Sequence, residues 1–149
     1  MRALVFALQF RGRGTEVAPG RRRATTTAGS QLFRTVLAAT GIEAGVEPLG
    51  EETATLEAEV QMTGEGTFVE SGRIRYGTAG GVTFRTVGHG VRGPSGIPGR
   101  IIGAVLWEVT GGDGRFAGAT GYITSNFAVE AGGEVVDHHV AQLVLPEGG

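Results

Sequence analysis

Apolar and polar residues alternate with a period of two along much of the chain, which is the pattern of strands with one buried face. The clearest stretch covers residues 54–62, where Leu56, Ala58, Val60 and Met62 alternate with threonine, glutamate and glutamine. Similar short runs, rich in β-branched residues, follow one another with glycine-rich turns between them. This pattern predicts strands rather than helices.

Seven or eight strands are predicted in this way. The expected strands cover residues 2–10, 54–62, 67–76, 82–89, 100–109, 122–129 and 135–145, and the expected turns cover 63–66, 77–81, 90–99, 110–114 and 130–133. Residues 30–40 fit either a strand or a short helix capped by Ser30, and we favour the strand. Gly72 is interpreted as a bulge or kink. Strand 100–109 is so apolar that we expect burial on both of its faces.

A polar segment near the N-terminus interrupts the strand pattern. Residues 11–29 combine arginine, glycine and threonine with almost no large apolar side chain, so we expect a flexible, Arg-rich loop. The basic side chains of this region are Arg11, Arg13, Arg21, Arg22, Arg23 and Arg34. Such a cluster can bind phosphate or an anionic surface, while the simpler interpretation is a solvated loop.

Regular short strands with almost no helix predict an all-β sandwich or barrel. Tight hairpins favour a single closed antiparallel β-barrel of about eight strands, which removes exposed strand edges. A length of 149 residues fits one such domain, spanning residues 1–149. The 28 glycines are not periodic and suit the turns of this fold.

The composition of the chain limits the kinds of partner that it is expected to bind. A net charge of −2 argues against nucleic acid. The chain has no cysteine, which excludes disulfides and thiolate chemistry and fits a cytoplasmic protein. The apolar run at residues 3–8 is far shorter than the roughly 20 residues of a membrane-spanning helix. We therefore expect no nucleic-acid partner and no membrane association.

The most specific motif lies at residues 107–121, Trp-Glu-Val-Thr-Gly-Gly-Asp-Gly-Arg-Phe-Ala-Gly-Ala-Thr-Gly. With two strands after it, His139 in the last strand and a Leu-Val-Leu-Pro ending, it resembles the allene oxide cyclase-like barrels. This group includes dirigent proteins and barrel-shaped polyketide cyclases. The resemblance covers residues 60–149 and implies a calycin-like barrel that forms homo-oligomers. No catalytic residue is carried over from it, because the functions of the group vary.

Polar side chains that face the inside of an apolar barrel are the candidate site residues, since burying them is costly unless they are paired. Because imidazole titrates near neutrality, His139 and His89 are the candidate acid–base residues. The candidate ligand-binding residues are Trp107, Tyr122, Asn126 and Arg85. We expect Trp107, Tyr122, Asn126 and His139 to share one face of three neighbouring strands, with Arg85 or His89 nearby. The opposite face would then carry Ile102, Leu106, Ile123, Phe127 and Val140.

Metal and cofactor chemistry find no support in the sequence. His138 and His139 are adjacent on a strand and point to opposite faces, so they cannot hold one ion together. The sequence contains no Gly-x-Ser-x-Gly motif, the nucleophile elbow that would indicate a serine hydrolase. The glycines near residue 112 precede no helix and do not indicate a dinucleotide site. We expect neither metal nor cofactor.

Two functions remain. The first is a barrel that binds an apolar small molecule and acts as a cofactor-independent cyclase or isomerase. The second is a non-enzymatic structural or oligomerising barrel with a packed interior. A cavity lined by Trp107, Tyr122 or His139 favours the first, and a filled interior favours the second. The resemblance and the apolar strand 100–109 also predict a homo-oligomer, either a dimer or a trimer.

Overall fold

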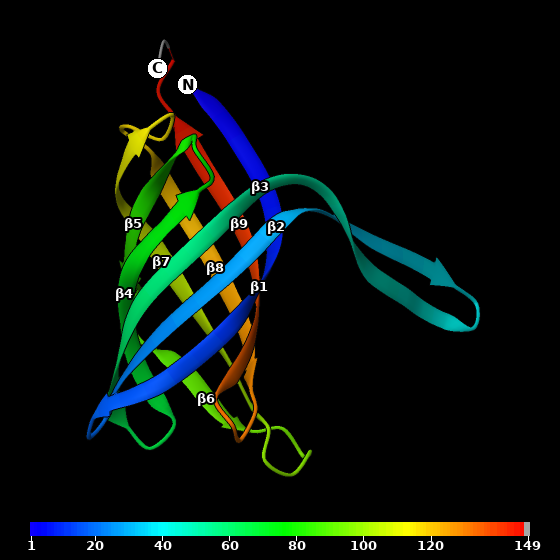
Figure 1. The fold of residues 1–149 in the computed structure, drawn as a ribbon, viewed down its shortest axis with the longest axis vertical. Helices are drawn as coiled ribbons and strands as arrows, with labels where there is room; N and C mark the ends of the chain where they lie inside the picture. Colours follow the sequence, from blue (N-terminus) through cyan, green and yellow to red (C-terminus); the bar gives the residue numbers. More distant parts are fainter. Residues whose placement is uncertain (148–149) are drawn as a thin grey trace.

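The computed structural model describes residues 1–147, which form nine β-strands in one antiparallel sheet (Figure 1). The strands are β1 (Arg2–Ala18), β2 (Arg21–Ala38), β3 (Gly41–Gly64), β4 (Thr67–Tyr76), β5 (Gly80–Thr86), β6 (Gly90–Pro94), β7 (Ile101–Gly114), β8 (Thr120–Val129) and β9 (Glu134–Leu145). The all-β prediction is confirmed. None of the described residues forms a helix with the length and apolar character needed to cross a membrane.

The strand pairings run around a ring. Neighbouring strands follow the order β3-β2-β1-β9-β8-β7-β5-β4, and β3 also pairs with β4, so the two ends of this order are hydrogen-bonded to each other. The short strand β6 pairs with both β4 and β7. Figure 1 shows these strongly tilted strands wrapped around one interior. The ring therefore gives every strand in it a partner on both sides for part of its length.

The interior of the ring is filled by alternate side chains from its strands. The largest of the fully buried side chains are Trp107, Phe10, Phe68, Phe84, Leu56, Ile74, Ile123 and Leu143. The rings of Phe84 and Trp107 stack with their centroids 4.0 Å apart. In β3, Leu56 and Ala58 are buried while Glu57 and Glu59 are exposed, which confirms the predicted alternation.

The prediction of a loop over residues 11–29 is wrong. This segment is a hairpin of β1 and β2, paired from Arg11 with Thr27 to Ala18 with Arg21. Its inward positions hold glycine, alanine and threonine, and most of its arginines point outward. A period of two is therefore present, but small side chains carry it in place of large apolar ones.

Other element boundaries also differ from the prediction. Residues 90–94 form β6 within the expected loop, and residues 110–114 continue β7 where a turn was expected. Residues 30–38 belong to β2, so the favoured strand is confirmed there. Ile102 and Leu106 remain 48% and 38% exposed, so β7 is not buried on both faces within one chain. Only the inward face of β7 contacts the interior of the ring.

Gly72 is not a bulge, because it pairs in register with Ala58 on one side and with Phe84 on the other. Its inward face lies so close to β3 that an added Cβ would press on the carbonyl oxygen of Glu57. We expect Gly72→Ala to lower the free energy of unfolding by about 1–3 kcal/mol, measured by urea denaturation.

The matched control is Gly93→Ala in β6, where an added Cβ meets no atom within 4 Å. We expect this control to change stability by no more than about 0.5 kcal/mol. Equal losses in the two variants would show that the close approach of β3 and β4 at Gly72 does not matter.

Candidate functional site

A cavity of about 70 Å³ lies inside the ring, at the end where the β1–β2, β3–β4 and β8–β9 hairpins turn. Much of its lining is apolar and includes Phe68 of β4 and Phe127 of β8. These two rings contact each other edge to face, with centroids 5.8 Å apart. Against this apolar lining stand two acidic side chains, Glu70 and Asp137, which come from opposite walls of the ring.

Asp137 is held by two hydrogen bonds in the interior. The Ser125 hydroxyl donates to its Oδ1 at 2.7 Å, and His139 Nε2 lies 2.9 Å from its Oδ2. All three side chains are buried. Pairing of Ser125 with His139 across β8 and β9 brings them together, and Asp137 shares their face two residues before His139. Both carboxyl oxygens of Asp137 are thereby fixed in direction.

The His139 ring is positioned by aromatic neighbours. Its centroid lies 4.4 Å from that of Phe10 and 5.0 Å from that of Trp107. Its Nδ1 has no hydrogen-bond partner among the described residues. This arrangement fits the neutral tautomer, with the proton on Nε2 donated to Asp137. His139 does not line the cavity, but it contacts Asp137, which does.

Glu70 faces Asp137 from β4. Burial raises the pKa of its carboxyl group to about 8, and the negative charge of Asp137 contributes to the same shift. The indole N–H of Trp107 favours the ionised form and offsets part of this effect, although it forms no hydrogen bond of ordinary geometry. A carboxyl group with this pKa carries its proton at neutral pH and can donate it.

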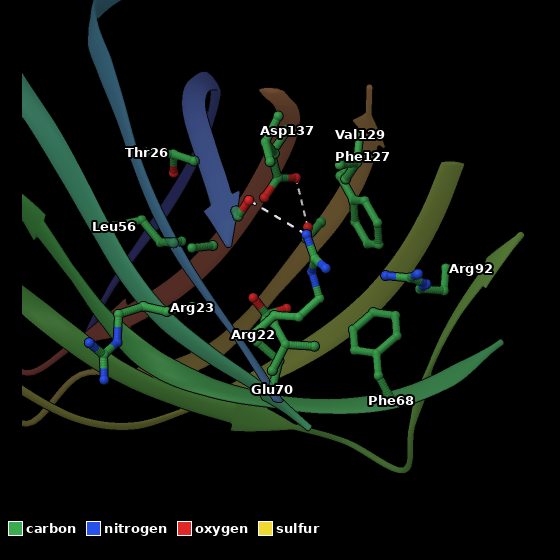
Figure 2. Close-up of a pocket in the computed structure, with 15 residues that line it drawn as sticks. Arg22, Arg23, Thr26, Leu56, Phe68, Glu70, Arg92, Phe127, Val129 and Asp137 are labelled. Carbon is green, nitrogen blue, oxygen red and sulfur yellow. Dashed lines mark hydrogen bonds between the residues drawn. The ribbon is translucent and has the colours of Figure 1, made fainter. Parts of the chain in front are cut away.

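Three arginine residues, Arg22 and Arg23 of β2 and Arg92 of β6, also line the cavity. Figure 2 shows the Arg22 side chain extending between Glu70 and Asp137. Its guanidinium makes a single long hydrogen bond of 3.5 Å to the Gly14 carbonyl oxygen, and no ion pair within residues 1–147. Hydrogen bonding therefore holds Arg22 only weakly in this position.

The structure brings together two of the residues expected at the site, Trp107 and His139, which meet in the interior. Tyr122 and Asn126 are exposed on the outer face of β8, so the expectation that they share a face with Trp107 is wrong. The reason is register: Trp107 pairs with Ile123, which turns Tyr122 outward. The residues expected on the opposite face are also split between the two faces. Ile123 and Phe127 point inward, whereas Ile102, Leu106 and Val140 are exposed.

Arg85 and His89 lie away from the cavity. Arg85 points outward from β5 and forms an exposed ion pair with Glu108 at 2.6 Å. Strand β5 ends at Thr86, so His89 lies in the following bend with its side chain exposed, and the expected shared face with Arg85 does not exist. Neither residue lines the cavity.

Glu70 and Arg22 lie in the interior although the sequence was not predicted to place them there. The signal for Glu70 was present, because it is in phase with the buried Phe68 and Ile74 of β4. Arg22 is likewise in phase with the inward Ala24 and Thr26 of β2. A charged residue at an inward position of a strand is the pattern that identifies both.

Comparison with known proteins gives one similar fold. No family model matches the chain, and no curated protein matches it. Among solved structures, a pterocarpan synthase dirigent protein matches over 97% of this chain and 92% of its own, with 12% sequence identity and a TM-score of 0.33. The two folds superpose only loosely, so the function of this chain has to be argued from its own side chains.

Proposed function

We propose that this chain is a small-molecule-binding β-barrel whose site is the cavity between Glu70 and Asp137. The observation that carries the proposal is the pair of acidic side chains facing one cavity, one of them with a pKa raised to about 8. Ionisable groups with strongly shifted pKa values in a concave site mark candidate functional sites. The long hydrogen bond of Arg22 supports the proposal, because hydrogen bonding holds the side chain between the two acids only weakly.

The size of the cavity defines the kind of ligand. Its volume of about 70 Å³ is well below the roughly 300–1,000 Å³ of a pocket that encloses a drug-sized molecule. The ligand therefore inserts one polar group, a hydroxyl or a carbonyl, between the acids. Its apolar remainder lies against Phe68, Phe127 and Val129, which line the same opening. An apolar molecule with one such group fits this site.

The two acids also supply the chemistry of a cofactor-independent cyclase or isomerase. Protonated Glu70 donates a proton to the inserted oxygen, and the carboxylate of Asp137 removes a proton from the substrate. The substrate gains one proton and loses one, which leaves Glu70 ionised and Asp137 protonated. A proton then returns from Asp137 to Glu70, so the cycle consumes no cofactor and no external base. Ser125 and His139 are positioning residues in this scheme, because each of them holds one carboxyl oxygen of Asp137.

A non-enzymatic barrel with a packed interior is the alternative, and one observation favours it. Around Trp107 the interior is filled, with Phe84 stacked on one face of the indole and the His139 ring perpendicular to it. In this interpretation the buried polar side chains only form hydrogen bonds with one another and bind no ligand. It predicts that no small molecule enters the ring.

Two variants are expected to shift ligand affinity in opposite directions. Phenol and cyclohexanone are suitable probes, and binding can be followed by saturation-transfer NMR and by the fluorescence of Trp107, the single tryptophan. Glu70→Ala removes a hydrogen-bond donor and is expected to weaken binding about tenfold. Arg22→Ala empties the opening and is expected to strengthen binding several-fold.

The control is Glu59→Ala, which removes an outward carboxylate of β3 and should leave the affinity unchanged. Thermal melting of each variant checks that the fold is retained. If neither probe binds to the wild type or to Arg22→Ala, the packed-interior alternative is correct.

A further inference from the structure

A hairpin made of residues 31–48 extends beyond the ring, and we call it the arm. Residues 31–38 of β2 pair with 41–48 of β3 and with no other strand among the described residues. Figure 1 shows the arm projecting away from the ring. A two-stranded hairpin on its own is marginally stable in water, so its side chains need a surface to cover them.

The arm has one apolar face. Its cross-strand pairs place Phe33, Thr35, Leu37, Ile42, Ala44 and Val46 on that face. The opposite face is mixed, with Leu32 and Val36 beside an ion pair of Arg34 with Glu47 at 3.9 Å. Near the ring, Phe33 contacts His138 edge to face, with ring centroids 6.2 Å apart. At the tip, Leu37 and Ile42 are 77% and 71% exposed.

The outer surface of the ring is polar over β2 and β3, whereas over β7, β8 and β9 apolar side chains alternate with polar ones such as Thr124 and Asn126. The outward positions of β2 and of the ring part of β3 hold arginine, threonine, glutamate and glutamine. We call the outward face of β7, β8 and β9 the outer wall; its exposed apolar side chains include Ile102, Leu106 and Val140. A sheet face in contact with water is ordinarily polar, so the outer wall lacks a cover within this chain.

The outer wall is also concave. A groove of about 590 Å³ runs over Ile102, Ala104, Ala128 and Val136 and reaches His138, beside the base of the arm. Ile102, Ala128 and Val136 form one cross-strand row in this groove. The chain thus exposes an apolar hairpin face and a groove with one apolar row, which is flanked by the polar side chains of Arg92, Asn126 and His138.

We propose that the arm of one copy lies with its apolar face on the outer wall of a second copy, in a closed assembly where each copy gives one arm and receives another. Contact area supports a closed assembly. The arm is roughly 26 Å long and about 10 Å wide, so one arm–wall contact buries roughly 500 Å² in total. In a dimer both contacts join the same two copies and together bury roughly 1,000 Å², which reaches the lower limit of specific interfaces, so a dimer is the closed assembly that the area favours.

The alternation within the arm supports this geometry over edge-to-edge pairing. Edge pairing of two arms would leave Leu37 and Ile42 in water, whereas lying flat on the wall buries them and keeps Arg34 and Glu47 solvated. The partner is a second copy, because each chain carries both the apolar face of the arm and the outer wall. Every copy in solution therefore offers the surface that the arm of another copy needs. This inference does not depend on the cavity between Glu70 and Asp137.

Light scattering after size-exclusion chromatography tests the assembly. The wild type at about 100 µM is expected at a multiple of 15.3 kDa, and Ile42→Asp is expected to raise the dissociation constant at least about tenfold and release 15.3 kDa monomer. The matched control Val36→Asp places the same charge on the mixed face and should keep the assembly. A wild-type monomer, or an equal loss in both variants, overturns the proposal.

Site-directed cross-linking tests the geometry, since the chain contains no cysteine of its own. Purified Ile42→Cys and Ile102→Cys are mixed and oxidised, so that a disulfide between them can form only between two copies. A cross-linked species that requires both variants supports the arm–wall contact. The control pairs Val36→Cys with Ile102→Cys, and cross-linking of equal yield there overturns the proposal. A disulfide within one chain of the double variant, with no link in the mixture, overturns it as well.

Discussion

Replacing Trp107 with alanine is expected to lower the free energy of unfolding by about 3–5 kcal/mol. The indole is completely buried, stacks on Phe84 and lies perpendicular to the His139 ring. Its removal leaves a cavity in the filled part of the interior, because the surrounding strands are tied into a ring and cannot collapse freely. Urea unfolding followed by far-ultraviolet circular dichroism measures the loss without depending on tryptophan fluorescence.

Two further variants calibrate that result. Trp107→Phe keeps an aromatic ring against Phe84 and should cost less than the alanine variant. Val69→Ala removes apolar atoms from the outer face of β4 and should cost about 0.5 kcal/mol. A loss below about 1 kcal/mol for Trp107→Ala would mean that the interior rearranges around the missing ring.

The stability of the wild type is expected to fall as the pH rises from about 5 to 8, and Glu70→Gln is expected to remove this fall. The folded chain keeps the Glu70 proton up to a pKa of about 8, while the unfolded chain releases it near 4.5. Between these values the unfolded state binds fewer protons, so raising the pH favours unfolding. Above pH 8 both states are ionised and this contribution stops changing.

The size of this effect follows from the shift. At about 1.4 kcal/mol per pH unit, the change from 4.5 to about 8 amounts to a few kcal/mol, reduced by the partial exposure of the side chain. Asp137, Arg22, Arg92 and the nearby His139 also face or adjoin Glu70. The wild type and Glu70→Gln both contain these groups. The difference between their two pH profiles therefore measures the contribution of the Glu70 carboxyl group.

Thermal melting from pH 5 to 9 measures both profiles. Glu59→Gln, on the outer face of β3, is the control and should follow the wild type. Parallel curves for wild type and Glu70→Gln would show that the Glu70 carboxyl group has no raised pKa. The proposed proton donation at the site would then lose its basis.

The strands from residue 54 onward could be predicted because large apolar side chains mark their inward positions. In β3 and β4 the alternation gives the correct face for Leu56, Ala58 and Phe68. The β1–β2 hairpin was not predicted, because glycine, alanine and threonine occupy most of its inward positions and no large apolar side chain marks them. Strand β6 was missed because glycine and proline dominate a stretch that pairs with its neighbours only briefly.

The candidate site could be predicted only in part. Alternation places Asp137 and His139 on one face, and the order of strands makes Trp107 a neighbour of that face. The register between β7 and β8 is not encoded locally, which is why Tyr122 and Asn126 were assigned to the wrong side. Glu70 and Arg22 come from strands on the far wall, and only the closed order of pairings brings them to Asp137.

The pairing of the first strand with the last has a consequence for biosynthesis. Arg2 pairs with Leu145, so β1 receives its second neighbour only after β9 has left the ribosome. Until then β1 has one unpaired edge. Contacts between such distant residues form slowly because a long loop must be closed first. A nascent chain that has not yet closed its ring is therefore the form most in need of a chaperone.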